Sequence, residues 1–567
     1  MALDGGVGIA NGISKRPSQI NGSVAVEKAA RRADEATEEE DEGKPWVARK
    51  WITSLAVCLA ALPLLAIMVS RRDGPLPLPS GWRPATTTRT YDRTESNQSR
   101  HLGDLIIPGF DEQSCISRYQ STPYRKNLTR SPSAHLVKRL REQEALQRRC
   151  GPGTEAYRRA AERLDSRRNG TRTTTDDDTC KYVVLVTYRG LGNRILAMAS
   201  AFLYAMLTDR VLLVDRGASI PDLFCEPFPE TSWLLPPDFP LRDLESLTGE
   251  VPESYRNLVE ESRAVSVSDL PYVFVDLDHA CTYHDKLFYC DDHREFLHRA
   301  PWLVMRTDGY FVPALFLNPA YQEELDRLFP RKDAVFYLLG RYLFHPTNRV
   351  WGLITRFYDS YLKNSDERLG IQVRVFDGDT PFKHVLDQIL ACTSKEHLIP
   401  EVVAQEPVWP ASARSKAVLM TGLSSWYFEN IRGRYWQSAT ATGEVVSVHQ
   451  PSHEEHQLTG EATHDMKALA EMYLLSMTDA IVTSGWSTFG YVGHGLGGLT
   501  PWIMFKPENL TTPNPPCRRA ASMEPCLHGP PFYDCKARRG ADTGKLVPHV
   551  RHCEDMSWGL KLVHPEY

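Results

Sequence analysis

The sequence predicts an α/β fold with parallel sheets, divided into two domains and preceded by one membrane-spanning helix. Residues 182–215 read as strand, glycine turn, helix and strand, which is a βαβ unit. Residues 368–502 repeat the alternation of strands and helices with a different set of polar loops. Residues 51–70 contain no charged residue. The remaining body, roughly 390 residues, exceeds one typical domain and indicates two.

The βαβ unit consists of the apolar run Tyr182–Val186, a helical pattern over Ile195–Thr208 and a second apolar run, Val211–Asp215. The turn after the first strand lies at the carboxyl end of a parallel strand, where such sheets bind ligands. Arginine and backbone N–H groups there suit a phosphate or a sugar nucleotide. The turn is neither GxGxxG nor a P-loop, so it is not typical of an NAD or ATP site. The candidate ligand-binding residues of this turn are Gly190, Gly192, Asn193 and Arg194.

Residues 51–70 predict a membrane anchor. Arg49-Lys50 and Arg71-Arg72 flank the segment, and twenty helical residues span about 30 Å, the thickness of a bilayer core. A cleaved signal peptide does not fit, because fifty mostly polar residues precede it. A buried core helix is the alternative. Basic residues on both sides mean that the positive-inside rule barely discriminates between orientations.

Glycosylation sequons and cysteines indicate the orientation. The sequons begin at Asn97, Asn127, Asn169 and Asn509, all after the apolar segment. Eleven of the twelve cysteines also follow it, and none forms a CxxC pair. Disulfides in a secretory lumen are expected, and the odd number leaves one cysteine free or joined to another chain. We expect a single-pass type II protein with its amino terminus in the cytosol and its bulk in the lumen.

The chain therefore divides into five predicted segments. A stem is expected where Pro, Ser, Thr and Arg are frequent, with a helix inside it over Ser133–Arg149. A net charge of −5 and 42% hydrophobic residues give no charge field of the kind that binds nucleic acid. The segments are a cytosolic tail (1–50), the anchor (51–70), a lumenal stem (71–175), an amino-terminal domain (176–360) and a carboxy-terminal domain (361–567).

The carboxy-terminal domain begins with a β-patterned run over Arg368–Phe376. In such a run Gln372 and Arg374 point to the same face. A charged side chain near the end of a core strand requires an anionic partner. A protein carboxylate and a ligand diphosphate both satisfy that requirement, and the run alone does not choose between them.

A second ligand loop is predicted farther along. Strands are expected at Ala417–Gly422 and Ala480–Thr483, and helices at Trp426–Tyr435 and Asp465–Thr478. The strand at 480–483 runs into a loop that carries Ser484, Ser487, Thr488 and Tyr491. Hydroxyls and glycine at a strand-to-helix turn suit an anion at a helix N-terminus, and they equally suit an ordinary capped helix. The loop is not a GxSxG elbow, so a nucleophilic serine is disfavoured.

Several motifs in the same order resemble the plant xyloglucan-type α-1,2-fucosyltransferases, Golgi enzymes that use GDP-fucose. The resemblance extends from about Lys181 to Val563. One departure is local, since the turn Tyr188–Leu191 is shorter than the form usual in that family. The matching segments are 190–194, 201–204, 209–214, 223–228, 340–346, 370–376, 483–502 and 522–526.

The resemblance implies a GT-B-like fold, with an active cleft between two Rossmann-like domains, and inverting transfer of L-fucose from GDP-β-L-fucose to a galactosyl 2-hydroxyl without an essential metal. Arg374 then holds the donor diphosphate, and Tyr491, Ser487 and Thr488 line the nucleotide pocket. Asp308 lies near the acceptor sugar, where it is either the general base or a hydrogen-bonding partner. The expected partners are GDP-fucose, a cell-wall or other glycan acceptor and the Golgi membrane.

The sequence leaves three alternatives for the function. The protein fucosylates xyloglucan; or it fucosylates arabinogalactan or another glycan; or it is a non-catalytic GDP-fucose-binding scaffold of a Golgi complex. A homodimer is compatible with the sequence, although no heptad or interface pattern requires one.

Two acidic pairs resemble the DxD metal motif, Asp276/Asp278 and Asp377/Asp379. Patterns of three residues are frequent by chance, so we predict no metal. His279, His284 and His293 fall near Cys281 and Cys290, which suggests zinc, but their spacing is irregular. A disulfide between Cys281 and Cys290 that closes a loop before Asp308 is the preferred prediction.

Overall fold

The computed structural model describes residues 101–124, 130–170, 180–217, 219–260, 270–279, 281–290, 294–375, 381–404 and 414–565. All of them belong to one compact unit, residues 91–567. No helix within these described ranges is long and apolar enough to cross a bilayer. The predicted tail and anchor lie outside the described residues.

The first sheet contains four parallel strands in the order β2-β1-β4-β3. Along β1 the side chains alternate between two cores, since Val183 and Leu185 face one and Val184 and Val186 face the other. Both faces are therefore covered, as is typical of parallel sheets. The strands are β1 (Tyr182–Val186), β2 (Val211–Val214), β3 (Val273–Asp276) and β4 (Trp302–Arg306).

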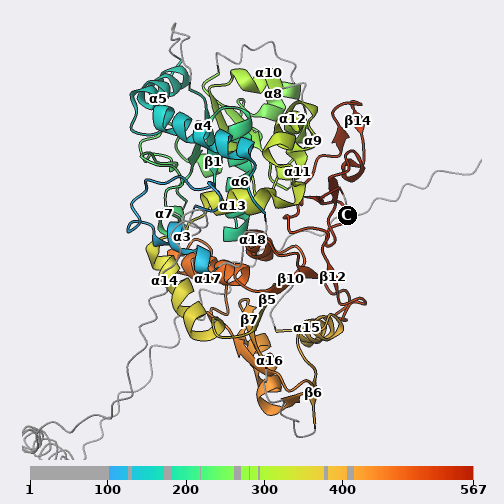
Figure 1. Cartoon of the computed structure of the whole chain (residues 1–567). Coiled ribbons are helices and arrows are strands. Elements are labelled where there is room, and N and C mark those ends of the chain that lie inside the picture. The colour runs from blue at the N-terminus through green and yellow to red at the C-terminus, as the bar shows by residue number, and fades with distance from the viewer. Residues whose placement is uncertain are drawn as a thin grey trace, which may run out of the picture. The chain divides into compact units, whose positions relative to one another are not determined.

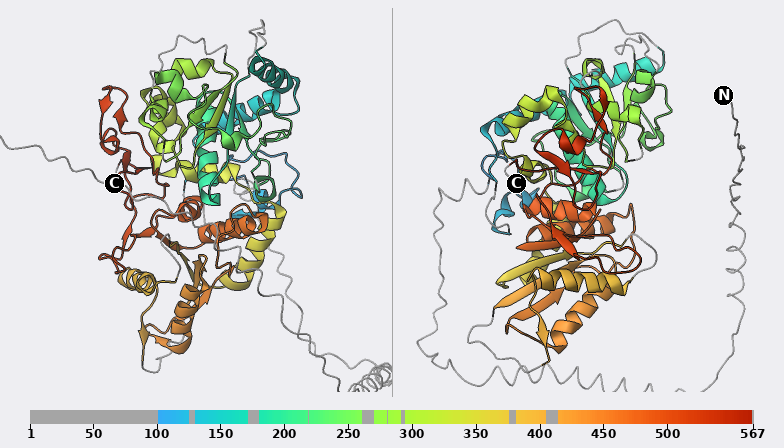
Figure 2. Two further views of the ribbon diagram at one scale, coloured as in Figure 1. Left: turned by 180° about the vertical axis from the view of Figure 1, so that it is seen from behind. Right: turned by 90° about the vertical axis from the view of Figure 1, so that its right-hand side faces the viewer.

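The second sheet has six strands in the order β12-β11-β10-β5-β7-β9, and only β12 is antiparallel. Helices α17 and α18 cover one face, and α15 and α16 cover the other (Figure 2). The strands are β5 (Glu367–Gln372), β7 (Ser415–Thr421), β9 (Val445–His449), β10 (Ala480–Ser484), β11 (Trp502–Met504) and β12 (Cys517–Arg519). The predicted α/β class with parallel sheets is confirmed.

Helices near the two sheets meet in one continuous apolar core. Leu196 of α6, Phe336 of α13 and Leu496 of α18 all belong to it, and α18 contacts both α6 and α13 (Figure 1). The helices are α3 (Ile116–Gln120), α4 (Ala134–Cys150), α5 (Glu155–Arg168), α6 (Leu191–Leu207), α7 (Ile220–Leu223), α8 (Tyr255–Glu260), α9 (Tyr283–Lys286), α10 (Arg294–Arg299), α11 (Val312–Leu315), α12 (Pro319–Leu328), α13 (Val335–Leu343), α14 (Asn348–Phe357), α15 (Lys383–Lys395), α16 (Ser425–Gln437), α17 (Ala462–Ser476) and α18 (Thr488–Gly497).

Short elements complete the fold. Strand pairs form between β6 (Val402–Val403) and β8 (Ala439–Thr440), β13 (Tyr533–Asp534) and β14 (Arg539–Gly540), and β15 (Val550–His552) and β16 (Leu560–Leu562). One π-helical turn, η7 (Tyr358–Leu362), continues α14. The 3₁₀ turns are η1 (Thr122–Tyr124), η2 (Leu244–Ser246), η4 (Leu287–Tyr289), η6 (Lys332–Ala334) and η8 (Thr543–Lys545).

Part of the predicted stem belongs to the packed body. The helix expected at 133–149 is present as α4, and Ser133 caps it by accepting a hydrogen bond from the Leu136 backbone N–H (2.9 Å). Leu136 and Leu140 of this helix are fully buried in the core, one turn apart on one face. The Arg-rich composition of the segment hides this apolar stripe, which is why its packing was not predicted.

Five disulfides join the described residues: Cys115–Cys225, Cys150–Cys180, Cys290–Cys535, Cys392–Cys517 and Cys526–Cys553. The predicted Cys281–Cys290 bond is therefore wrong. Helix α9 and turn η4 lie between these two cysteines, and Cys290 bonds to the carboxy-terminal segment instead. Cys281 is a free thiol, and burial raises its pKa to about 12.

Candidate functional site

The first turn of α6 touches the first turn of α18, because α6 begins at Leu191 and not at the predicted Ile195. Gly192 approaches so closely that a Cβ atom there would lie 2.7 Å from the Thr488 carbonyl carbon. The Thr488 hydroxyl donates to Asn193 Oδ1 (3.1 Å), and Asn193 Nδ2 donates to the Asp308 carbonyl (2.7 Å). Two predicted ligand loops, 295 residues apart, are thus one structure that presents two helix N-termini.

Arg194 uses its charge within the protein. Its Nη2 lies 2.7 Å from Asp465 Oδ2, its Nη1 donates to the Ser219 hydroxyl (3.0 Å), and both charged side chains are almost fully buried. The Ser219 hydroxyl also donates to Asp465 Oδ2 (2.5 Å). Arg194 and Asp465 line the neighbouring cavity, but a carboxylate already neutralises the guanidinium.

The β10–α18 loop is held by the carboxy-terminal segment. Trp486 has a left-handed backbone (φ +62°), and its N–H donates to Asp555 Oδ2 (2.8 Å). The Tyr491 hydroxyl donates to the same oxygen (2.5 Å) and lies 3.1 Å from His528 Nε2. Burial raises the pKa of Tyr491 well above its ordinary value. Tyr491 therefore shapes the loop from behind, whereas Trp486 lines the cavity.

Arg374 lies two residues after the end of β5. Its backbone N–H donates to the Ser484 hydroxyl (2.9 Å), so Ser484 fixes the arginine backbone to the neighbouring strand. On the same two neighbouring strands, the Thr483 hydroxyl donates to Gln372 Oε1 (2.8 Å) in the buried core. Burial lowers the pKa of the Arg374 guanidinium. Ser484 is a support and not a lining residue, whereas Arg374 lines the cavities on both sides of it.

Two adjoining cavities meet at Arg374. The first, of about 370 Å³, lies between the two ligand loops, and the predicted residues lining it are Gly190, Gly192, Asn193, Arg194, Asp308, Arg374, Ser487 and Thr488. Ser487 is the N-cap of α18 and accepts from the Gly490 N–H (3.4 Å). The structure thus brings together predicted residues from four chain segments that the sequence presents separately.

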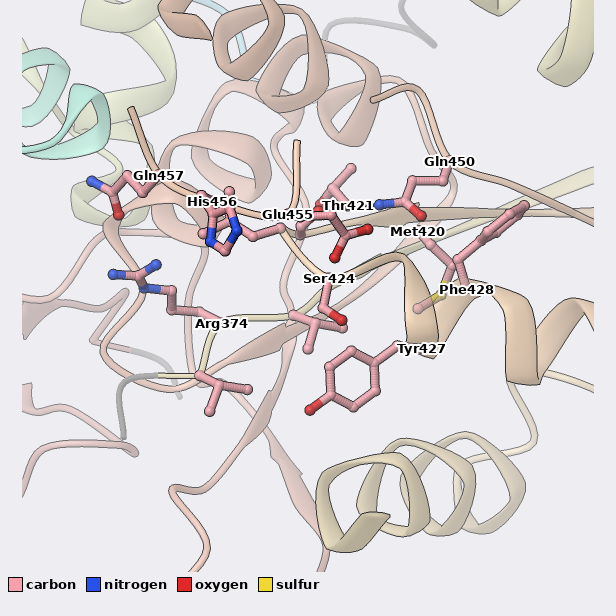
Figure 3. Close-up of a pocket in the computed structure, with 14 residues that line it drawn as sticks. Arg374, Met420, Thr421, Ser424, Tyr427, Phe428, Gln450, Glu455, His456 and Gln457 are labelled. Atoms are coloured by element: carbon pink, nitrogen blue, oxygen red, sulfur yellow. Dashed lines mark hydrogen bonds between the residues drawn. The ribbon is translucent and has the colours of Figure 1, made fainter. Parts of the chain in front are cut away.

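The second cavity, of about 480 Å³, extends from Arg374 over the carboxyl ends of β5 and β7. Figure 3 shows Arg374 and Gln457 at one end and Phe428 and Gln450 at the other. Tyr427 and Glu455 also line it. None of these residues except Arg374 was predicted. The one available signal was that a helix, now α16, starts just after a strand end.

An acidic cluster with one histidine follows β3 and β4, and its members Asp308 and His279 line the first cavity. Asp308 Oδ1 accepts from the His279 backbone N–H (3.0 Å), and Oδ2 accepts from His279 Nδ1 (2.6 Å). His279 Nδ1 also lies 2.7 Å from Asp278 Oδ1. Asp278 Oδ2 accepts from the Tyr188 hydroxyl. His279 thus joins the carboxylates of two neighbouring strands at the cavity wall.

The two DxD patterns have different outcomes. Asp276 Oδ2 is bound by Arg306 Nη2 (2.5 Å), and its Oδ1 accepts from the Asp278 backbone N–H (3.4 Å), so the Asp276 carboxylate already has protein partners. Asp377 and Asp379 lie outside the described residues. Asp278, His279 and Asp308 have polar atoms within 4.8 Å of one another, but His279 Nδ1 already contacts both carboxylates (2.7 Å and 2.6 Å).

Glu471 adds an unusual titrating group to the first cavity. It accepts from the Ser452 hydroxyl (2.5 Å), and burial raises the pKa of its carboxyl to about 8. Burial therefore favours the neutral form of this carboxyl group.

Comparison with known proteins gives a consistent result. A family model described as xyloglucan fucosyltransferase matches residues 82–536. Galactoside 2-alpha-L-fucosyltransferases of Pisum sativum and of Arabidopsis thaliana are each 55% identical, over 83% of this chain and 84% of each relative. The solved structure of an arginine-to-lysine variant of Arabidopsis thaliana FUT1 in complex with GDP is 54% identical, with a TM-score of 0.75 over 82% of this chain and all of that one.

Proposed function

The chain belongs to the xyloglucan fucosyltransferase family, and on that basis we propose that it is a galactoside 2-α-L-fucosyltransferase with GDP-fucose as its donor. The observation that carries this proposal is the position of Arg374, which lines both a cavity with aromatic walls and a cavity that Asp308 and His279 also line. GDP-fucose consists of a base, a diphosphate and a sugar. An aromatic wall suits the base, an arginine suits the diphosphate, and a polar pocket suits the sugar. The arrangement is that of a GT-B enzyme, with the amino-terminal sheet on the acceptor side.

The 480 Å³ cavity suits the nucleoside. Tyr427 and Phe428 supply apolar surface for a planar base, and Gln450 and Glu455 supply polar groups that hydrogen-bond its edge. The N–H donors of guanine match a carboxylate acceptor such as Glu455. The diphosphate then lies beside Arg374, whose planar guanidinium binds two phosphate oxygens at once.

Fucose transfer leaves negative charge on the β-phosphate and positive charge on the sugar. Arg374 and the N-terminus of α18, capped by Ser487, lie where that negative charge develops. The acceptor hydroxyl attacks from the opposite face of the sugar, which inverts the β-linkage of the donor to an α-linkage. A resident metal is not part of this proposal, because a protein cation and helix N–H groups meet the leaving charge.

The acceptor enters at the end of the first cavity, beside Asp308 and His279. A galactosyl residue there presents its 2-hydroxyl to the donor sugar, and we place xyloglucan first among acceptors because of the family description. We further propose a type II Golgi membrane protein with a lumenal catalytic body. Exposure of the sequon residues Asn169 and Asn509 supports lumenal glycosylation.

The test is a transfer assay with the full chain, GDP-fucose and a panel of galactosyl acceptors, with and without EDTA. We expect fucosylated xyloglucan in both conditions. Transfer to arabinogalactan alone would keep the chemistry and change the acceptor. GDP binding without transfer to any acceptor would overturn the proposed activity in favour of a non-catalytic scaffold. Activity lost in EDTA and restored by a divalent cation would overturn the metal-independent mechanism.

A further inference from the structure

Both carboxylate oxygens of Asp308 are already engaged by His279. Its side chain is buried (8% exposed), and both carboxylate oxygens accept hydrogen bonds from His279, one from the backbone N–H and one from Nδ1. A general base needs an acceptor atom that faces the hydroxyl it deprotonates. Asp308 is poorly placed for that task, although it lies in the correct part of the cavity.

His279 has the opposite properties. Its side chain is 52% exposed and lines the cavity. Nδ1 points to the two carboxylates, so it carries the proton in the neutral ring, and the lone pair then resides on Nε2. Within the described part of the chain, no protein group hydrogen-bonds to that Nε2 atom.

We propose that His279 is the catalytic general base of the transfer and that Asp308 is its positioning residue. This inference rests on the proposed function. As the 2-hydroxyl oxygen of galactose bonds to C1 of fucose, its proton moves to His279 Nε2. The bond from C1 to the β-phosphate oxygen breaks, and GDP leaves with that electron pair. The imidazolium returns its proton to water after product release.

The charges around the imidazole favour this role. Asp278, after β3, and Asp308, after β4, both contact Nδ1 and stabilise the cation that forms. Arg189, from the β1–α6 turn, approaches the same two carboxylates (3.6 Å and 3.9 Å) and partly offsets them. His464, from α17, and His528, from the carboxy-terminal segment, are the other histidines that line this cavity. His464 Nδ1 lies 3.0 Å from one carboxylate, Glu454 Oε2, but its side chain is only 11% exposed, against 52% for His279.

His528 is the less suitable base. Its Nε2 lies 3.1 Å from the Tyr491 hydroxyl, whose own proton goes to Asp555, so the ring donates to that oxygen. Burial lowers the pKa of His528, which disfavours formation of an imidazolium. No carboxylate is hydrogen-bonded to its ring, whereas His279 has two within the described residues.

The test compares single variants of the full chain in fucose transfer and in GDP binding. His279→Gln is expected to lower kcat by about 10²–10⁴ while the Kd for GDP is unchanged. Imidazole is expected to restore transfer in His279→Ala, and the acid limb of the wild-type pH profile is expected to vanish in His279→Gln. His284→Gln is the matched control, because His284 also pairs with a carboxylate, Glu260, but does not line the cavity.

Asp308→Asn tests the positioning role. We expect a lower kcat with GDP binding retained, and the double variant with His279→Gln is expected to be no slower than His279→Gln alone. Additive losses would show that Asp308 acts independently of His279 and would overturn its assignment.

The outcomes separate this inference from the proposed function. Absence of transfer by the wild-type chain refutes the function itself. Transfer by the wild type and equally by His279→Gln refutes the base assignment alone. Rescue by imidazole of His528→Ala but not of His279→Ala also refutes it. If His279→Ala does not fold, the acid limb of the wild-type profile and its loss in His279→Gln decide the question.

Discussion

Arg194 and Asp465 form a buried ion pair of 2.7 Å that joins the first helix of the amino-terminal sheet to α17, which packs on the other sheet. The two side chains are only 5% and 4% exposed. Ser219 hydrogen-bonds to both of them. The wall of the active cavity is thus fixed by an interaction between residues 271 positions apart.

Removal of one partner of this pair is expected to destabilise the fold. Arg194→Met leaves Asp465 buried without its counter-ion, which typically costs about 3–5 kcal/mol. Arg194→Met combined with Asp465→Leu is expected to recover much of that loss. Urea unfolding followed by tryptophan fluorescence measures both effects. Arg158→Met, which breaks an exposed pair, is the control. A single variant as stable as the wild type would contradict the prediction.

Gly192 and Gly190 provide a matched pair in one turn. A Cβ at Gly192 would meet Thr488 backbone and side-chain atoms at 2.7–2.8 Å, whereas at Gly190 the nearest atom is 3.6 Å away. Gly192→Ala should therefore force the two ligand loops apart, with a loss of about 1–3 kcal/mol and weaker GDP binding. Gly190→Ala should be tolerated. Thermal unfolding and GDP titration distinguish the two, and equal behaviour would show that the loops are not in contact.

Arg374→Ala is expected to lower kcat by about 10²–10³, because a preorganised charge is removed from the leaving phosphate. Arg374→Lys keeps the charge but not the bidentate geometry, so an intermediate rate is expected. Initial rates at saturating GDP-fucose provide the measurement. Arg434→Ala, on the exposed side of α16, should have no effect. Full activity of Arg374→Ala would show that the arginine does not bind the donor.

Two buried glutamates give stability a specific pH dependence. Burial raises the pKa of Glu524 and of Glu471 to about 8. The folded protein therefore keeps protons that the unfolded chain releases above the ordinary glutamate pKa. The free energy of unfolding is highest below that value and falls as pH rises to about 8, on the order of 1 kcal/mol per pH unit for each group.

Urea midpoints of the wild type and of Glu524→Gln between pH 5 and pH 9 test this dependence. The variant cannot release the proton, so its slope should be shallower than that of the wild type. Glu429→Gln, at an exposed position of α16, should keep the wild-type slope. If the urea midpoint of Glu524→Gln depends on pH as steeply as that of the wild type, a group other than Glu524 causes the dependence.

The observed disulfide pairing predicts different effects for substitutions of Cys290 and Cys281. Cys290→Ser opens the Cys290–Cys535 bond, which closes a loop of 245 residues, and a cost of about 2–5 kcal/mol is expected. Cys281→Ser removes only a free thiol and should leave stability unchanged. Non-reducing peptide mapping with thermal unfolding tests both, and a peptide that links Cys281 to Cys290 would contradict the structure.

Local patterns were sufficient to predict the elements around the site. The strand, glycine turn and helix at 182–207 follow from hydrophobic periodicity, as do β10 and the start of α18. The α/β class and the presence of one unpaired cysteine after residue 70 follow from the same kind of counting. These features depend on residues that are close together in the chain, so they can be predicted from a single sequence.

Long-range pairings were not predictable in the same way. Nothing local shows that Asn193 meets Thr488, or that Arg194 is neutralised by Asp465. The Cys281–Cys290 prediction failed because it relied on proximity in the sequence. Tyr427 and Phe428 were predicted only as part of a helix, and the structure shows that they line the same cavity as Arg374. His279 was weighed only as a metal ligand, because its contact with Asp308 spans two strands.

The most direct test of the proposed function is the structure of the product. The full chain is incubated with GDP-fucose and a galactosylated xyloglucan oligosaccharide, and the linkage is read by two-dimensional NMR, with a 2-deoxygalactosyl acceptor as control. We predict one α-L-fucosyl residue on the galactose 2-hydroxyl and no product from the deoxy acceptor. A β-linkage, another hydroxyl or fucosylation of the deoxy acceptor would contradict the inverting 2-α-transfer proposed here.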